Sequence, residues 1–120
     1  MDLTTKHIRG VMVVSLAGRL DHAGAPTLKE KLAPLLLDCH NGGYPMVLDL
    51  SDVDYVSSVG LRVFMLAAKQ VSSQGGKVVV AGLQPIVKEI FEISRFDRVL
   101  QVCPSVEGAV AQLGTDRDRS

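Results

Sequence analysis

The feature that most constrains the fold is the alternation of strand-like and helix-like segments along most of the chain. From residue 24 onward, short runs rich in valine and leucine are separated by longer segments whose apolar residues recur with helical spacing. The strand-like runs cover residues 46–50, 77–81 and 99–102, and the helical segments begin near Pro26, Ser58, Pro85 and Ser105. Strands that alternate with helices form right-handed crossovers between parallel neighbours. The sequence therefore predicts an α/β fold with a largely parallel core.

The first 20 residues predict an antiparallel hairpin in front of this core. We expect strands at residues 3–9 and 11–17, with a turn at Arg9-Gly10, and the apolar residues Val11, Val13, Val14 and Leu16 are typical of a half-buried strand. Gly18 is expected to end the second strand. The hairpin adds antiparallel pairing, so we expect a mixed sheet of about four to five strands packed with about four helices.

Length and cysteine content indicate a single domain. The chain has 120 residues, and we expect the domain to cover residues 1–113, with a disordered polar tail at 114–120. Cys39 and Cys103 are far apart and form no CxxC pair, so we expect reduced thiols in the cytoplasm. The first residues do not form an apolar secretion segment, and we expect a cytoplasmic protein.

Composition argues against two classes of partner. The 13 basic and 13 acidic residues cancel, and aromatic residues make up only 4% of the chain, unlike the basic, base-stacking surface of a nucleic-acid binder. The apolar runs are far shorter than the roughly 20 residues that a membrane-spanning helix needs. We therefore expect neither a nucleic acid nor a membrane as partner.

The helices predict which side chains form the core. The helix at 58–73 is apolar nearly all round, so it is either deeply buried or keeps one apolar face for a partner. Pro34 should kink or interrupt the helix at 26–39, because proline lacks a backbone N–H. In the helix after residue 85, the inner face is predicted to consist of Ile86, Ile90 and Ile93, together with Val87 and Phe91.

Two adjacent serines stand where a strand gives way to a helix. An apolar strand runs into a short acidic turn, which is followed by Ser57, Ser58 and a helix that opens on Gly60-Leu61. Free backbone N–H groups and the positive end of the helix dipole favour negative charge at such a place. A serine here is therefore either an N-cap or a phosphorylation switch. The two serines can also divide these roles, with Ser57 as the cap and Ser58 as the switch.

No other pattern indicates catalysis or a bound group. Asp49, Asp52 and Asp54 suggest a metal site at first sight, but Asp49 lies within a strand and the other two are expected to be solvated turn residues. The three histidines lack zinc-site spacing, no Ser-His-Asp set is evident, and neither Gly-Gly pair continues as a phosphate-binding loop. We expect no catalytic residue, no metal and no cofactor.

Several pieces of the sequence occur in an order and spacing typical of one family. They are GRLD at 18–21 before PTL at 26–28, VLDLS at 47–51, VSSVGL at 56–61, Gly75-Gly76 before the strand at 78–80, and VKEIFEISRFDRV at 87–99. The resemblance spans about residues 3–113, nearly the whole chain. Together these pieces resemble the STAS family, and within it the small bacterial anti-sigma-factor antagonists.

The resemblance implies a protein that is a substrate and a binding partner, not an enzyme. The family's phosphorylated serine stands two residues before the glycine of a Gly-Leu pair, which is Ser58 here. Many members carry aspartate where this chain has Ser57, so Ser57 is a second candidate hydroxyl. Unphosphorylated members bind an ATP-dependent serine kinase that is also an anti-sigma factor, which releases the sigma factor. Phosphorylation breaks that complex, and a metal-dependent serine phosphatase restores it.

The expected partner surface surrounds the start of the same helix. It comprises Asp21, His22, Ser57, Val59, Gly60 and Arg62. Arg62 lies four residues after Ser58 on the same helical face, so it can pair with a phosphate there, pair with an acidic residue of the kinase, or stay solvated. Asp21 is either a turn-closing carboxylate or part of the partner surface.

Two other functions stay open on the sequence alone. A STAS subunit of a transport or other regulatory complex would co-purify with ATPase or membrane subunits and would not turn over phosphate on Ser58. A small enzyme would need a catalytic constellation, which the sequence does not display. The sequence does not identify the sigma factor or other output, and we expect the chain to be a monomer or a weak dimer.

Overall fold

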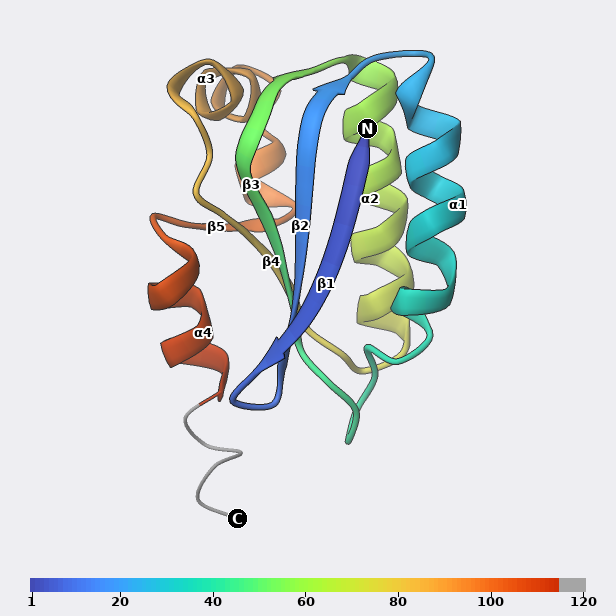
Figure 1. Cartoon of the computed structure of the whole chain (residues 1–120), viewed down its shortest axis with the longest axis vertical. Coiled ribbons are helices and arrows are strands. Elements are labelled where there is room, and N and C mark those ends of the chain that lie inside the picture. The colour runs from blue at the N-terminus through green and yellow to red at the C-terminus, as the bar shows by residue number, and fades with distance from the viewer. Residues whose placement is uncertain (115–120) are drawn as a thin grey trace.

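The centre of the molecule is a five-stranded mixed sheet with the strand order β1-β2-β3-β4-β5 (Figure 1). The computed structural model describes residues 1–114. Its strands are β1 (Asp2–Ile8), β2 (Val11–Leu20), β3 (Met46–Val56), β4 (Val78–Ala81) and β5 (Gln101–Cys103). β1 and β2 form an antiparallel hairpin, and β2, β3, β4 and β5 are parallel neighbours. The expected mixed sheet is therefore confirmed.

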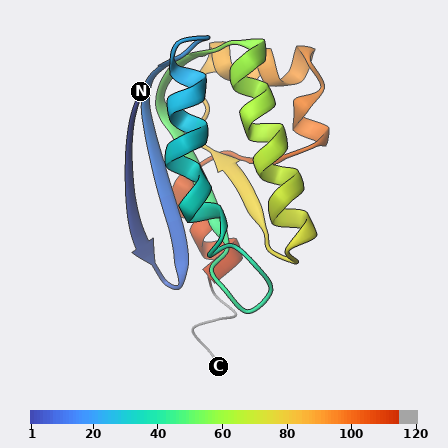
Figure 2. The ribbon, with the colours of Figure 1, turned by 90° about the vertical axis from the view of Figure 1, so that its right-hand side faces the viewer.

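Helices cover the two faces of this sheet unequally. The α-helices of the described part are α1 (Gly24–Leu36), α2 (Ser58–Ser73), α3 (Pro85–Ile93) and α4 (Val106–Gly114), and a short 3-10 helix, η1 (Phe96–Arg98), precedes β5. Figure 2 looks onto α1 and α2, which lie side by side, whereas α4 lies on the opposite face. The wider layer of helices therefore belongs to the face that carries α1 and α2.

The pleat of the strands sends alternate side chains into two cores. Met12, Val14 and Leu16 of β2 point into the larger core, while Val11 and Val13 point into the smaller one. The larger core receives Leu28 and Leu32 of α1, Phe64 of α2, and Val87 and Phe91 of α3, and the smaller core receives Ala109 and Val110 of α4. The first halves of β2 and β3 are buried on both faces, which is why they read as nearly continuous apolar runs.

β3 extends further than the sequence predicts. It continues through Val56, so the prediction of an acidic turn after residue 50 is wrong, and Asp52 and Asp54 are exposed residues of the strand. Buried Val53 and Val56 fix this second half of the strand on the larger core. The acidic residues are tolerated because they point away from that core.

β2 lengthens together with β3. The expectation that Gly18 ends the strand is wrong, because β2 runs on to Leu20 and stays paired with β3 up to Val56. Its register shifts twice, once on each side of the Ala17–Gly18 pair, as at a β-bulge. Gly18 has a φ of 112°, a conformation that residues with a Cβ rarely adopt. The glycine therefore bends the strand without ending it.

The inner face of α3 differs from the sequence-based prediction. Val87 and Phe91 are fully buried as expected, but Ile86 is 50% exposed and Ile93 is 75% exposed, so placing these two isoleucines on the inner face is wrong. Aromatic packing decides the orientation of the helix. The ring of Phe91 lies 5.2 Å from that of Phe96 and 6.4 Å from that of Phe64, both in other elements.

Several smaller expectations have definite outcomes. Pro34 does not break α1 where it stands, since the helix ends two residues later at Leu36. Cys39 and Cys103 are both buried and unbridged, and burial raises the pKa of each thiol. α4 includes Gly114, so the prediction that this residue belongs to a disordered tail is wrong, and the rest of the predicted tail, residues 115–120, lies outside the described part. Among residues 1–114, no helix combines the length and apolar character that crossing a membrane requires.

The start of α2 packs unusually close to the end of β2. Gly60 is buried in the first turn of α2, and a Cβ placed there would lie 2.6 Å from Cγ of Leu20 and 2.8 Å from its Cδ2. Leu20 is itself fully buried, so its side chain has no free space to move into. Because residue 60 has no side chain, the backbone of α2 can lie directly against the side chain of Leu20.

Replacing Gly60 with alanine should therefore destabilise the fold. Alanine gains up to about 1 kcal/mol in helix propensity over glycine, and overpacking a filled core costs about 1–3 kcal/mol. At an approach of 2.6 Å we expect the upper half of that cost, and so a net loss of about 1–2 kcal/mol. Urea unfolding measures the difference. Gly108→Ala in the first turn of α4 is the matched control, because Gly108 is exposed and an added Cβ would approach only the Ser105 hydroxyl, at 3.1 Å, so this variant should be close to neutral. A Gly60→Ala variant as stable as the parent would show that the contact with Leu20 is not tight.

Candidate functional site

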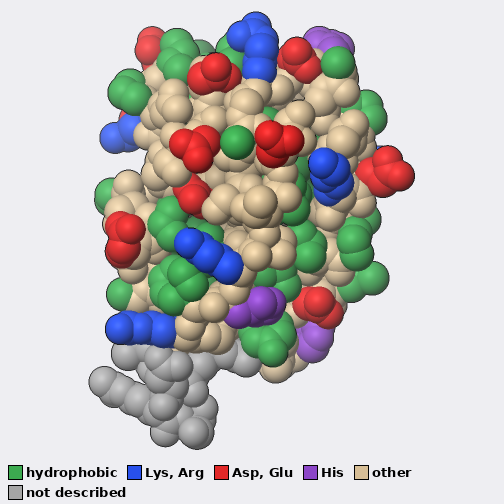
Figure 3. Space-filling view, in the orientation of Figure 1, with side chains coloured by type: hydrophobic (Ala, Val, Ile, Leu, Met, Phe, Trp, Pro, Cys, Tyr) green, Lys and Arg blue, Asp and Glu red, His purple; other side chains and the backbone are tan. Residues whose placement is uncertain are grey.

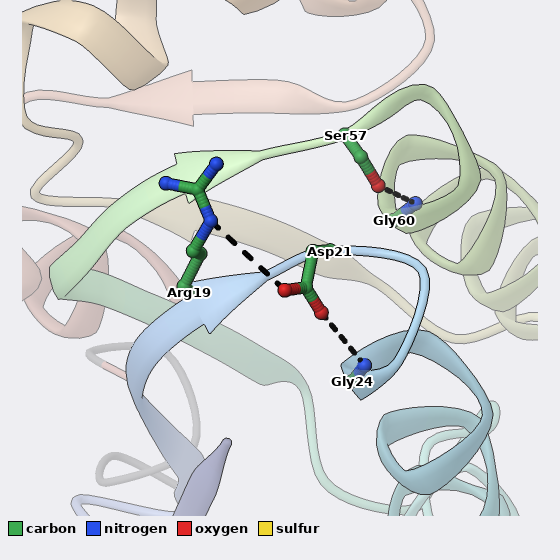
Figure 4. A network of polar contacts seen from close by, with 5 residues as sticks. All are labelled: Arg19, Asp21, Gly24, Ser57 and Gly60. Carbon is green, nitrogen blue, oxygen red and sulfur yellow. Dashed lines mark hydrogen bonds and ion pairs between the residues drawn. The ribbon is translucent and has the colours of Figure 1, made fainter.

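Two turns meet at the edge of the sheet where the parallel strands end. One turn leads from β2 into α1 and the other leads from β3 into α2. The backbone N–H of Ser57 donates a hydrogen bond of 2.8 Å to the carbonyl oxygen of Leu20, which ties the second turn to the first. Figure 4 shows the two turns side by side, with Ser57 and Asp21 on them. Ligands of open parallel sheets are commonly bound at this edge.

Ser57 is the N-cap of α2. Its backbone is extended, with φ −82° and ψ 170°, and its Oγ accepts a hydrogen bond of 3.1 Å from the backbone N–H of Gly60 (Figure 4). The side chain is only 7% exposed. The predicted capping role of Ser57 is confirmed, and its hydroxyl is occupied by an intramolecular contact.

Ser58 occupies the next position and has a different environment. It is the first residue of α2 and is exposed, and its hydroxyl makes no hydrogen bond with any other residue of the range 1–114. The first turn of α2 contains no acidic residue, so no carboxylate of that turn offsets the positive end of the helix dipole. The arrangement leaves a free hydroxyl at a helix start that favours an added negative charge.

Asp21 closes the turn into α1. Its Oδ1 accepts a hydrogen bond of 3.0 Å from the backbone N–H of Gly24, and this bond lowers the pKa of Asp21 below its ordinary value. Oδ2 lies 3.9 Å from Nε of Arg19, an exposed pair of little energetic weight. Arg19 in turn stacks over the ring of Tyr55, with 4.1 Å from its guanidinium carbon to the ring centroid. His22 is exposed beside this turn.

The structure separates the predicted partner surface into exposed and buried members. Ser57 and Gly60 are buried, so they shape the helix start and offer little side-chain surface. Arg62 is exposed and Val59 half-buried, and both line a hollow between α1 and α2. The other lining residues of this hollow are Ala25, Pro26, Lys29, Val63 and Leu66.

The contribution of α1 to this surface is absent from the sequence-based prediction. Pro26 and Lys29 belong to a segment about 30 residues away in the chain, and no local spacing connects them with Arg62. Only the packing of α1 against α2 brings them together. The amphipathic pattern of α1 indicates a buried face but not the helix that lies beside it.

Asp49 belongs to a separate polar cluster on β3. Its Oδ2 accepts a 3.0 Å hydrogen bond from the Ser15 hydroxyl, and its Oδ1 accepts bonds from the backbone N–H and the hydroxyl of Ser51. These serines satisfy the carboxylate, so it stabilises the pairing of β2 with β3. Within the described residues, no three His, Cys, Asp or Glu side chains are grouped as metal ligands.

Charge is distributed evenly over the face shown in Figure 3. Acidic and basic side chains are interspersed there, as a formal net charge of zero would suggest. The long-range field of such a surface is weak. Electrostatic selectivity at the helix start must therefore come from nearby groups, namely the N–H groups of α2 and the guanidinium of Arg62.

The different environments of the two serines predict different effects on stability. Ser57→Ala removes the cap of α2 and should cost about 1 kcal/mol of unfolding free energy. Ser58→Ala removes only an exposed hydroxyl and should change stability by less than about 0.5 kcal/mol. Urea unfolding of both variants tests this expectation. Equal losses for the two variants would contradict the division of roles between them.

The sequence is similar to a known domain family and to curated proteins of that family. The STAS domain family model matches residues 2–109. BtrV, a candidate anti-sigma factor antagonist of Bordetella bronchiseptica, is 40% identical over 115 residues, which cover 96% of this chain and 97% of that protein. An anti-sigma-B factor antagonist of Bacillus subtilis (strain 168) is 34% identical over 97 residues, covering 81% of this chain and 85% of that protein.

A solved structure agrees with the fold. The crystal structure of an anti-sigma factor antagonist from Mycobacterium paratuberculosis superimposes with a TM-score of 0.83 at 22% identity, covering 93% of this chain and 92% of that one. At this identity the likeness concerns the fold alone. Sequence, family model and fold agree over nearly the whole length of the described residues, and the chain belongs to the STAS domain family.

Proposed function

We propose that this chain is an anti-sigma factor antagonist that is switched by phosphorylation of Ser58. The observation that carries the proposal is the exposed, unpaired hydroxyl of Ser58 at the N-terminus of α2, next to a serine whose own hydroxyl is occupied. The two relatives described above, one a candidate antagonist and the other an anti-sigma-B factor antagonist, support the assignment of function. In this proposal the chain is a substrate and a binding partner rather than a catalyst.

A phosphate on Ser58 would be stabilised where it forms. It adds about −1.5 to −2 charges near neutral pH, at a helix end whose backbone N–H groups favour negative charge. Arg62 lies four residues further along α2, which brings the two side chains to neighbouring positions on one helical face. The guanidinium can then make charge-assisted hydrogen bonds with the phosphate. The modification therefore needs no rearrangement of the core.

The proposed partners are those implied by the family. The unphosphorylated chain binds an ATP-dependent serine kinase that is also an anti-sigma factor, and a metal-dependent serine phosphatase reverses the modification. Both reactions are proposed to take place in the cytoplasm. The contact is centred on Ser58, Val59 and Arg62, with Asp21 and His22 at its rim. Ser57 and Gly60 contribute by fixing the helix start.

Phosphorylation should be confined to Ser58. The protein is incubated with ATP and the serine kinase encoded nearest to its gene, and the modified peptide is mapped by mass spectrometry. Ser58→Ala should abolish the modification. Ser57→Ala should still be modified at Ser58, because the loss of one cap costs only about 0.5–2 kcal/mol and leaves the fold intact. Phosphate on Ser57 alone, or on neither serine, would exclude the proposed switch.

Phosphorylation should weaken binding to the kinase by roughly a hundredfold or more. A doubly charged group placed in a desolvated contact meets repulsion and loses hydration, and each factor of ten in affinity corresponds to about 1.4 kcal/mol. Ser58→Asp should reproduce part of this loss, since one carboxylate carries less charge. Arg62→Glu should also weaken binding, with little change in melting temperature, because the side chain is exposed.

Calorimetric titration of each variant with the kinase measures these effects. Lys69→Glu is the matched control for Arg62→Glu, since Lys69 is an exposed cation of α2 away from the helix start. It should bind like the parent. If Ser58→Asp and Arg62→Glu also bind like the parent, the start of α2 is not the interface and the switch mechanism is wrong for this chain.

A further inference from the structure

A continuous groove runs between α1 and α2, away from Ser58. Two adjoining hollows form it, and they share Lys29, Val63 and Leu66. The end near the start of α2 is lined by Val59 and Arg62, and the far end by Leu36 and Gln70. The groove therefore begins within one turn of the proposed phosphorylation site and follows α2 for about three turns.

The floor of this groove is apolar and accessible. Leu66 is 40% exposed, although most leucines of the chain are buried, and it lines both hollows. Pro26 and Ala33 of α1 are also exposed, whereas Ala25, Leu32 and Val63 line the groove as buried residues beneath them. An exposed apolar surface that adjoins a polar contact site is typical of a protein interface.

Both charged residues that line the groove are cations. Lys29 stands on α1 and Arg62 on α2, and both side chains are exposed. No aspartate or glutamate lines either hollow, and neither cation forms an ion pair within residues 1–114. An occupant with carboxylates at the edges of an apolar surface would complement this arrangement.

A second copy of the chain fits the groove poorly. In a two-fold symmetric dimer the same patch faces itself, so Lys29 and Arg62 of one copy would approach the same two cations of the other. Like charges placed opposite one another at an interface disfavour the association. The charge pattern therefore favours a different, acidic partner.

We propose that the groove between α1 and α2 docks an acidic, partly apolar segment of the serine kinase, as an extension of the contact at Ser58. This inference rests on the proposed function, and it names a second region of the same interface. Leu66 is the apolar anchor, and Lys29 and Arg62 pair with carboxylates of the kinase segment. Arg62 then serves two roles, because a phosphate on Ser58 competes with the kinase carboxylate for its guanidinium.

Two substitutions test the groove separately from the helix start. Leu66→Glu places a negative charge on the apolar floor and should weaken kinase binding at least tenfold. Lys29→Glu reverses a charge at the rim and should weaken binding about threefold to tenfold, with a smaller dependence of affinity on salt than the parent shows. Binding is measured by calorimetry with the kinase that phosphorylates Ser58, at low and at high salt.

The matched controls are Lys31 on α1 and Leu37 directly after it, both outside the groove. Lys31→Glu repeats the charge reversal two residues from Lys29, and Leu37→Glu repeats the leucine substitution at a position that is 64% exposed. Both should bind within twofold of the parent. Melting temperatures show whether Leu66→Glu is folded. If it is not, the affinity of Lys29→Glu and its salt dependence decide whether the groove binds the kinase.

The outcomes separate this inference from the function on which it rests. If Leu66→Glu and Lys29→Glu bind within twofold of the parent while Ser58→Asp and Arg62→Glu bind weakly, the groove is not a docking site and the switch at Ser58 stands. If the control substitutions weaken kinase binding to the same extent, the groove is not a docking site, because the loss of affinity would then follow from the overall charge of the protein. Absence of any binding by the parent chain would overturn both proposals.

Discussion

The arrangement of the site depends on one junction, at which the end of β2 is held against the start of α2. The Ser57 N–H donates to the carbonyl oxygen of Leu20, and Gly60 lies directly on the Leu20 side chain. Neither contact involves an exposed group, so the junction is insulated from changes at the surface. It fixes the direction in which α2 leaves the sheet, and with it the positions of Ser58, Arg62 and the wall of the groove.

Two adjacent serines show how burial separates a structural hydroxyl from one that is free to react. Ser57 is buried and uses its hydroxyl to complete the first turn of α2, whereas Ser58 is exposed and has no intramolecular bond among the described residues. The same chemical group is therefore structural at one position and available for chemistry at the next. A modification at Ser58 can change the surface charge while the cap and the core beneath it stay in place, which suits reversible control.

Much of the fold and part of the site follow from local sequence patterns. The alternation of elements, the start of α2 and the cap at Ser57 are encoded within a few residues, and the comparisons confirm the family that the sequence resembles. The errors lie where distant residues decide. The spacing in α3 allows either the isoleucines or Val87 and Phe91 to face the core. The contacts of the Phe91 ring with the rings of Phe64 and Phe96 turn Val87 and Phe91 inward. Likewise, β3 lengthens because a bulged β2 stays beside it, and Lys29 reaches the site only through the packing of two helices.

The composition of the surface around Ser58 has a consequence for substrate recognition. Asp21 and His22 come from the turn after β2, and Ser58, Val59 and Arg62 come from the start of α2, more than 30 positions further along the chain. An unfolded chain or a short peptide would hold only part of this surface. An enzyme that reads the whole of it can act only on copies that have completed folding. Under the proposed switch, newly made or damaged copies would not be phosphorylated, and the response would depend on the number of folded molecules rather than on the total number.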